Sequence, residues 1–301
     1  MSFQLHAEEG LQDGLRRIAH SELDISIHEI DDRELGRHKT VHQVRKHCKK
    51  LRGLLRLVRP AMEEVYKAEN EALRDAARNL SDIRDAKSII LTYDNVMHRF
   101  ADQVNQQSFE PIRLELTARL SDIKDTLVDE RLLLMRQQLA AVKARVNDWT
   151  FDDQTFEPAR AGLTKNRQEA VKALREAMKN PTTHRLHELR KRVKYHWYHL
   201  QILSGLWPAT ICPLISEFGH LGDELGNDHD LAIFDETVCH SPDQFGIPNE
   251  VRVLEGLIVK HRKLSQEACF NRAAYLFAEN TEAFTLRLES YWKIWTKCSD
   301  F

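Results

Sequence analysis

The sequence is poor in residues that break helices, because its 301 residues include only 11 glycines and 8 prolines. Between these breaks, apolar residues recur every three or four positions, as Leu51, Leu54, Leu55 and Val58 do. This spacing is typical of amphipathic helices, whereas the alternation that predicts β-strands is almost absent. The sequence therefore predicts an all-α protein of roughly ten helices without a substantial sheet.

Few features point to disulfide bonds, export or a membrane. The five cysteines are odd in number, scattered and never in a Cys-x-x-Cys pattern, which indicates reduced thiols rather than a disulfide framework or a zinc site. The N-terminal residues MSFQLHAEEG lack the apolar core of a signal peptide. No run approaches the ~18 apolar residues of a membrane span. We therefore expect a soluble, cytoplasmic protein without a membrane partner.

The common phosphate-binding and metalloenzyme motifs are also absent. The sequence has no G-x-x-x-x-G-K-[ST] loop, no G-x-G-x-x-G and no H-E-x-x-H. No pairing of a nucleophile with a base stands out. The glycines of GHLGDELG, residues 219–226, have the helical spacing that permits close packing of helices. These observations predict a binding protein that is not an enzyme and needs neither a cofactor nor a metal.

Positive charge is concentrated in one segment of a chain whose net charge is only −2. Residues 41–60, VHQVRKHCKKLRGLLRLVRP, contain seven Lys and Arg, two His and no acid. Positions three, four and seven apart share a helix face, so the basic residues form a ridge of His42, Arg45, Lys46 and Lys49, extended by Arg52, Arg56 and Arg59. Like charges at this spacing destabilise a helix, which favours a bound anion; pairing with acids on neighbouring helices is the alternative.

The same pattern recurs at an offset of 145 residues, where His42, Arg45, Lys46 and Lys49 correspond to His187, Arg190, Lys191 and Lys194. At this offset Leu80 and Asp85 also correspond to Leu225 and Asp230, and Arg84 corresponds to His229. Two separate blocks at one offset predict a tandem duplication of a helical unit. We expect the repeats to span residues 1–150 and 151–301, together one domain, with the boundary in residues 148–158.

Both basic segments resemble the His-x-x-Arg-Lys-x-x-Lys signature of the CHAD domain, the conserved histidine α-helical domain. The segments are HQVRKHCKKLRGLLRL and HELRKRVKYHWYHLQIL, and the later blocks LSDIRDAKSI and LGNDHDLAIF resemble the family's second signature. The resemblance implies two antiparallel helical bundles related by a pseudo-twofold axis, with basic helices facing a shared groove or pore. It also implies binding of inorganic polyphosphate and association with polyphosphate granules, where protein partners would be present.

By position, the resemblance assigns polyphosphate binding to the repeated basic residues of both halves. They are His42, Arg45, Lys46, Lys49, His187, Arg190, Lys191 and Lys194. Lys50, Arg52 and Arg56 of the first basic segment are further candidate binding residues outside that match. The second half departs from the first where Tyr195, Trp197 and Gln201 replace Lys50, Arg52 and Arg56. Asp85 and Asp230, with Arg84 and His229, are expected to support the site, the two aspartates by orienting basic side chains, by pairing across the bundle or, alternatively, by capping helices.

Three other interpretations remain open on the sequence alone. Nucleic acids and nucleotides carry phosphates that would suit the ridge, although aromatic residues are not interleaved through the first basic segment as a stacking platform requires. Histidine pairs at helical spacing (38/42, 184/187 and 196/199) allow a metal-binding protein. The carboxyl-terminal stretch with Trp292 and Trp295 is expected to be a packing element, with a protein-docking surface as the alternative.

Overall fold

The computed structural model of the protein describes residues 3–239, 242–245 and 248–297. Over these residues the chain forms helices and turns without strands, as the sequence predicts. The α-helices are α1 (Leu11–Asp31), α2 (Arg37–Leu57), α3 (Glu63–Arg78), α4 (Ser81–Arg99), α5 (Glu110–Ser121), α6 (Asp125–Arg145), α7 (Glu157–Lys179), α8 (Thr183–Ile202), α9 (Pro208–Cys239), α10 (Pro248–Leu276) and α11 (Thr281–Lys297). Short 3-10 helices are η1 (Arg59–Ala61), η2 (Gln106–Phe109), η3 (Val146–Asp148), η4 (Ser204–Leu206) and η5 (Pro242–Phe245).

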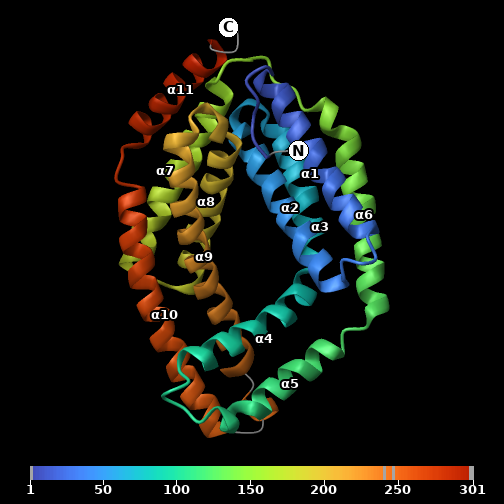
Figure 1. The fold of residues 1–301 in the computed structure, drawn as a ribbon, viewed down its shortest axis with the longest axis vertical. Coiled ribbons are helices and arrows are strands. Elements are labelled where there is room, and N and C mark those ends of the chain that lie inside the picture. The colour runs from blue at the N-terminus through green and yellow to red at the C-terminus, as the bar shows by residue number, and fades with distance from the viewer. Residues whose placement is uncertain (1–2, 240–241, 246–247, 298–301) are drawn as a thin grey trace.

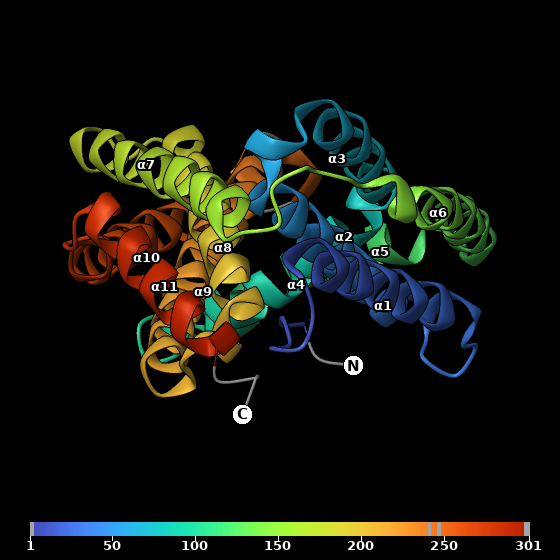
Figure 2. The same cartoon turned by 90° about the horizontal axis from the view of Figure 1, so that it is seen from above.

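The helices form two arms that meet along α2 and α8 (Figure 1). In the first arm α1, α2, α3 and α6 pack around one another, and in the second α7, α8, α9, α10 and α11 do so. Seen from above, α2 and α8 lie between the outer helices of the two arms (Figure 2). The all-α class with two helical bundles is therefore confirmed. Among the described residues, no helix combines the length and apolarity that crossing a membrane requires.

A main core runs through both arms, and a second core joins their far ends. The second core combines α4 and α5 with α9 and α10; in it the Tyr93 ring packs edge-on against Phe234 at 6.2 Å between centroids. The far end is thus shared by residues from both sides of the expected boundary. That boundary, between residues 148 and 158, lies between η3 and α7, and the duplication itself stays a prediction.

The two halves differ where α3 and α4 meet, because the corresponding part of the second half is one continuous helix, α9. In the first half α3 ends before Asn79 and α4 begins after Leu80, so the chain changes direction between them. In the second half α9 runs without interruption through the corresponding positions, Glu224 and Leu225. The break directs α4 across the molecule towards the second arm, where it packs against α9 (Figure 1). As a result, side chains from α4 reach residues of the other half.

The start of α2 depends on Gly36, which has φ of 76°. Residues with a Cβ rarely adopt this left-handed conformation, so glycine permits the sharp turn between α1 and α2. At the other end of the chain, Trp292 of α11 is buried and packs on Phe156 at 5.3 Å between ring centroids. The expected packing role of the carboxyl-terminal stretch is confirmed for Trp292.

A buried ion-pair network joins α1 to α2. The Glu22 side chain is nearly inaccessible; its Oε1 accepts a hydrogen bond from Lys50 Nζ at 2.8 Å and its Oε2 contacts His47 Nδ1. His47 Nε2 lies 3.3 Å from an oxygen of Glu29. Burial raises the pKa of the Glu22 carboxyl, but the hydrogen bonds from His47 and Lys50 outweigh it, and the net pKa lies below its usual value of 4.5.

We expect Glu22→Gln to lower the free energy of unfolding by about 2 kcal/mol, because it leaves the Lys50 ammonium group and the buried His47 ring without the carboxylate that both contact. The lowered pKa of Glu22 means that its contribution is present above pH 4.5 and is lost as the pH falls through the folded-state pKa. Denaturant unfolding at pH 7 and below pH 4.5 would check this, because the difference in free energy of unfolding between the variant and wild type should be smaller in acid. Glu64→Gln, which removes an exposed carboxylate paired with Lys67, should change stability little at either pH.

Candidate anion-binding site

The two basic helices touch at Gly53 of α2 and Tyr198 of α8, which are corresponding positions of the predicted repeats. A Cβ on Gly53 would lie 2.9 Å from the Cβ of Tyr198, so only glycine permits this approach. Nearby, His199 Nε2 donates a hydrogen bond to the carbonyl oxygen of Gly53 at 3.1 Å. Burial lowers the pKa of His199 to about 3, so its imidazole is neutral. This contact holds α2 and α8 together beside the basic ridges.

The glycines of GHLGDELG lie on α9 and face α8, as their spacing predicts. A Cβ on Gly222 would lie 2.9 Å from Cδ of Lys194, and a Cβ on Gly226 would lie 3.3 Å from Nη2 of Arg190. Because these positions lack side chains, the two basic residues can lie against the α9 backbone. Lys194 Nζ also contacts Asp223 of α9 at 3.0 Å.

Arg84 of α4 joins the two halves at the basic ridges. Its Nη1 donates to Asp85 at 2.9 Å, and its Nη2 donates to Asp230 of α9 at 3.1 Å. The two aspartates therefore share one guanidinium group, and Asp230 pairs across the two halves as one of the sequence interpretations expects. Both aspartates lie inside helices rather than at their ends, which excludes the capping alternative.

Three cations of the ridges have neither a carboxylate within ion-pair distance nor a hydrogen bond or ring contact among the described residues: Lys46, Lys49 and Arg190. Nε of Arg190 is also buried without a hydrogen-bond partner. By contrast, Lys191 pairs with Glu188 at 2.7 Å. Unpaired positive charge is therefore concentrated on both ridges, as expected of a site that receives an anion.

Lys49 shows that the two ridges face one another. The pKa of its amine is lowered to about 7, first by desolvation and then by the positive charges of Arg190, Arg45, Arg84 and Lys194, two of which lie on α8. The side chain is nevertheless exposed to solvent. An amine that water reaches, but that protein atoms surround closely enough to desolvate, is expected on a concave, water-filled surface. Contact with water limits how far desolvation lowers the pKa of Lys49, and the positive charges of the four cations lower it further.

The ridge histidines are neutral at pH 7. Burial, followed by neighbouring cations, lowers the pKa of His42, His187 and His229, the last to about 4. The rings of His187 and His229 lie 4.6 Å apart between centroids, and Nδ1 of each is buried without a hydrogen-bond partner. These rings therefore add polar atoms rather than charge to the site in the absence of an anion.

The histidine pairs do not assemble into a metal centre among the residues that the structure describes. No group of three or more His, Cys, Asp or Glu has an arrangement that could hold an ion there. His196 is buried against the rings of Phe218 and Phe284, and His199 is bound to the backbone of Gly53. This pair therefore has a structural role.

Four predicted binding residues have partners on other helices of the first arm, or on α8. Lys50 is paired with Glu22 of α1, and Nε of Arg52 donates to Asn70 of α3 at 3.0 Å. Nη1 of Arg45 donates a hydrogen bond to the carbonyl oxygen of Ala77. The guanidinium carbon of Arg56 lies 5.3 Å from the ring centroid of Tyr66 and 4.3 Å from that of Tyr195. The structure thus separates Lys50, Arg52 and Arg56 from the facing cations around Lys49, whereas Arg45 remains among them.

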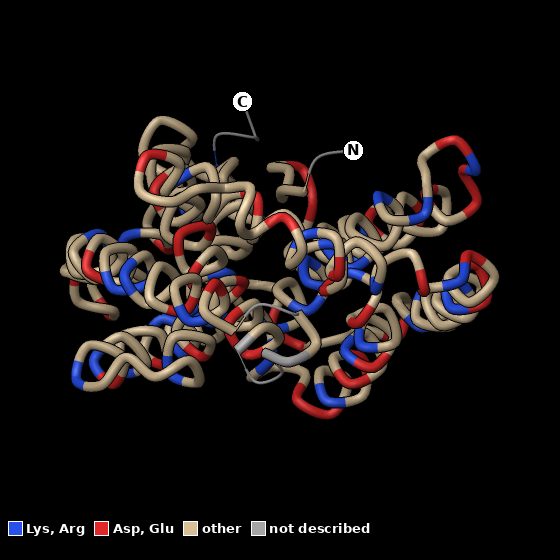
Figure 3. Tube along the Cα trace, turned by 90° about the horizontal axis from the view of Figure 1, so that it is seen from below, with Lys and Arg blue, Asp and Glu red and all other residues tan. Residues whose placement is uncertain are grey.

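Sequence reasoning missed the carboxylates that neutralise part of the site. Asp223 and Glu188 pair with lysines of the second ridge, and Glu22 removes Lys50 from the first. Asp223 could have been found from the sequence, because it lies in the glycine-rich segment 219–226, whose spacing predicts close packing against another helix. Elsewhere, Lys and Arg are mixed with Asp and Glu along both arms (Figure 3).

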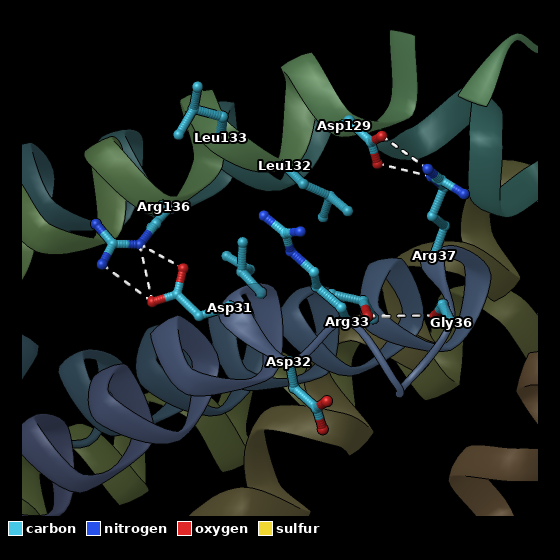
Figure 4. A pocket seen from close by; sticks show the side chains of 11 residues that line it. Asp31, Asp32, Arg33, Gly36, Arg37, Asp129, Leu132, Leu133 and Arg136 are labelled. Carbon is cyan, nitrogen blue, oxygen red and sulfur yellow. Dashed lines mark hydrogen bonds and ion pairs between the residues drawn. The ribbon is translucent and has the colours of Figure 1, made fainter. Parts of the chain in front are cut away.

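A cavity of about 610 Å³ lies away from the ridges, between α1, α2 and α6. Figure 4 shows Arg37 and Arg136 in its wall, each bound to an aspartate: Arg37 Nε lies 2.7 Å from Asp129, and Arg136 Nε lies 2.8 Å from Asp31. These pairs neutralise most of the positive charge of the wall. None of the predicted binding residues lines this cavity.

Comparisons with known proteins agree with the fold. The crystal structure of the CHAD domain from the plant Ricinus communis matches with a TM-score of 0.71 and 14% sequence identity, over 93% of this chain and 96% of that chain. A comparison with curated proteins finds no match. The sequence model of the CHAD domain family matches residues 23–238, more than half of the chain. The protein therefore belongs to the CHAD domain family.

Proposed function

We propose that this protein binds inorganic polyphosphate between the basic ridges of α2 and α8. The observation that carries the proposal is the position of Lys49, an unpaired cation of one ridge that lies within electrostatic range of Arg190 and Lys194 on the other. Such an arrangement is unfavourable until an anion lies between the helices. Membership of the CHAD domain family supports the same ligand.

The chemistry of polyphosphate suits this arrangement. The polymer carries about one charge per phosphate and has no bases to be recognised, so it requires cations spaced along a line. Lysine supplies point charges and arginine supplies forked donors, and a helix places successive turns about 5.4 Å apart. Two ridges from two helices can therefore contact one flexible chain from both sides.

In this proposal the protein acts by binding rather than by catalysis, and it associates with polyphosphate granules in the cytoplasm, where it would meet protein partners. Other polyanions, including nucleic acids and nucleotides, are the competing ligands. Asp223, Asp230 and Glu188 are paired with cations of the site, so a ligand must compete with these carboxylates. Polyphosphate is favoured because its charge density is high.

The first test is calorimetric titration of long-chain polyphosphate into the protein at about 50 and 200 mM salt. If about four phosphate charges are neutralised, affinity should fall about 100-fold between these conditions, because bound counterions are released. Single-stranded DNA of matched charge is the control ligand. Absence of polyphosphate binding would contradict the proposal, and equal affinity for DNA would favour a general polyanion-binding protein.

A further inference from the structure

The cavity between α1, α2 and α6 has the size and the mixed lining of a small-molecule site. Its volume of about 610 Å³ lies within the roughly 300–1,000 Å³ that is typical of such sites. The apolar side chains of Ile30, Leu132 and Leu133 share its wall with arginines and aspartates. A ligand that fits this wall therefore combines an apolar body with a charged group.

Arg33, in the turn between α1 and α2, is the cation of this wall that has no partner. It makes no hydrogen bond, ion pair or ring contact with any residue that the structure describes. Figure 4 shows its guanidinium group pointing towards α6, into the space between the ion pair of Arg37 and that of Arg136. Its N–H donors therefore face the cavity and are available to a ligand.

The other two arginines of the wall are neutralised within the protein. Arg37 donates to Asp129 through Nε at 2.7 Å and through Nη2 at 2.8 Å, and its Nη1 donates to Asp125 at 3.0 Å. Arg136 donates to Asp31 through Nε at 2.8 Å and through Nη2 at 3.0 Å. Both guanidinium groups are thus held by carboxylates in the forked geometry that an anionic ligand would otherwise take.

Asp32 does not neutralise Arg33, although the two residues are adjacent in the chain. Its Oδ1 accepts a hydrogen bond from the backbone N–H of Glu34 at 2.9 Å. Figure 4 shows the Asp32 carboxylate on the side of the turn that points away from α6, whereas the Arg33 guanidinium points towards it. The cavity therefore presents one unpaired positive charge.

One unpaired positive charge favours a ligand with one negative charge. A carboxylate has a single charge, and its two oxygens match two N–H groups of a guanidinium. A phosphate monoester carries about −1.5 to −2 at pH 7. Its excess negative charge would lie close to Asp31 and Asp129, which line the same cavity. The wall therefore suits a carboxylate better than a phosphate.

We propose that this cavity binds an aliphatic carboxylate, with the carboxylate group on Arg33 and the hydrocarbon chain on Ile30 and Leu132. Burial of the chain removes apolar surface from water and supplies affinity, while Arg33 fixes the position of the charged end. The cavity contains none of the basic residues assigned to polyphosphate. The proposal therefore does not depend on the proposed function.

The test is calorimetric titration of sodium octanoate, kept below the concentration at which it forms micelles, into the full-length protein and into its Arg33→Gln variant. Arg33 is exposed, so the variant is expected to fold. It should bind octanoate at least about 10-fold more weakly, because hydrogen bonds to a charged group are lost. Absence of octanoate binding to wild type, or equal affinity of wild type and variant, would overturn the proposal.

The matched control variant is Arg252→Gln on α10. Arg252 is also exposed and has no partner among the described residues, but it does not line this cavity. This variant loses the same charge and should bind octanoate like wild type. An equal loss of affinity in both variants would mean that net charge, rather than Arg33, attracts the carboxylate, and would contradict the proposal.

Two further ligands test the chemistry of the site in the wild-type protein. Butanoate keeps the carboxylate but has a chain half as long, so it should bind at least about 10-fold more weakly than octanoate; equal affinities would contradict contact with the hydrocarbon chain. Octyl phosphate keeps the chain and has more charge, and it should bind more weakly than octanoate. Tighter binding of octyl phosphate would overturn the assignment of a carboxylate in favour of a phosphorylated ligand.

Discussion

Replacement of Lys46 and Lys49 by glutamate is expected to lower the affinity for long-chain polyphosphate at least about 100-fold. Each substitution removes a charged contact worth roughly 1.5 kcal/mol or more, and about 1.4 kcal/mol corresponds to a factor of ten in affinity. The new carboxylates also repel the polymer. Calorimetric titration of wild type and of Lys46→Glu/Lys49→Glu at low salt measures the difference.

The variant is expected to fold, because both side chains are exposed and one reversal relieves repulsion between Lys49 and the cations around it. A matched control is Lys172→Glu/Lys179→Glu on α7, which changes the net charge equally at two exposed lysines that line a separate cavity with Thr281 of α11. The control should bind like wild type. If both double variants lose affinity to the same extent, net charge rather than the basic ridge controls binding.

Gly162→Ala is expected to lower the free energy of unfolding by about 3 kcal/mol, at the upper end of what overpacking costs. Gly162 lies on α7 against the end of α2, where a Cβ would stand 1.8 Å from the carbonyl oxygen of Leu57 and 2.9 Å from that of Arg56. Both obstacles are backbone atoms, which no change of rotamer can move. The two helices would have to separate at the junction of the arms, and the loss is measured by denaturant unfolding followed by circular dichroism.

Gly256→Ala is the matched control for this substitution. Gly256 lies inside α10 and is exposed, and no atom lies within 4 Å of the position that a Cβ would take there. Alanine there should stabilise the protein by roughly 0.5–1 kcal/mol, because glycine is the weaker helix former. Equal stability of the Gly162→Ala variant and wild type would mean that α2 and α7 can move apart without loss.

Much of the candidate site follows from residue spacing alone. His42, Arg45, Lys46 and Lys49 share a helix face because their spacing matches the helical period, and the offset of 145 residues identifies their counterparts on α8. Apolar periodicity is equally local, so it predicted the all-α class. These properties depend on residues within one helix, and for that reason a single sequence contains them.

Other features depend on contacts between residues far apart in the chain. Lys50 follows Lys49 directly, yet it turns towards Glu22 of α1, while Lys49 faces Arg190 of α8. Nothing in the sequence states which of two neighbouring lysines meets a carboxylate, because the partners come from other helices. For the same reason the sequence left Asp230 with several roles; its position inside α9 excludes capping, and its ion pair with Arg84 of α4 agrees with pairing across the two halves.

The sequence by itself determined that the chain is helical and carries two basic ridges, since both depend on the period of a helix. The tertiary structure decided that these ridges lie next to each other, because α2 packs on α8 where Gly53 meets Tyr198. It also decided which cations remain unpaired, leaving Lys49 and Arg190 without a carboxylate among the described residues. Electrostatic repulsion acts through space rather than along the chain, so only the packing of the helices could show where the site's charge is concentrated.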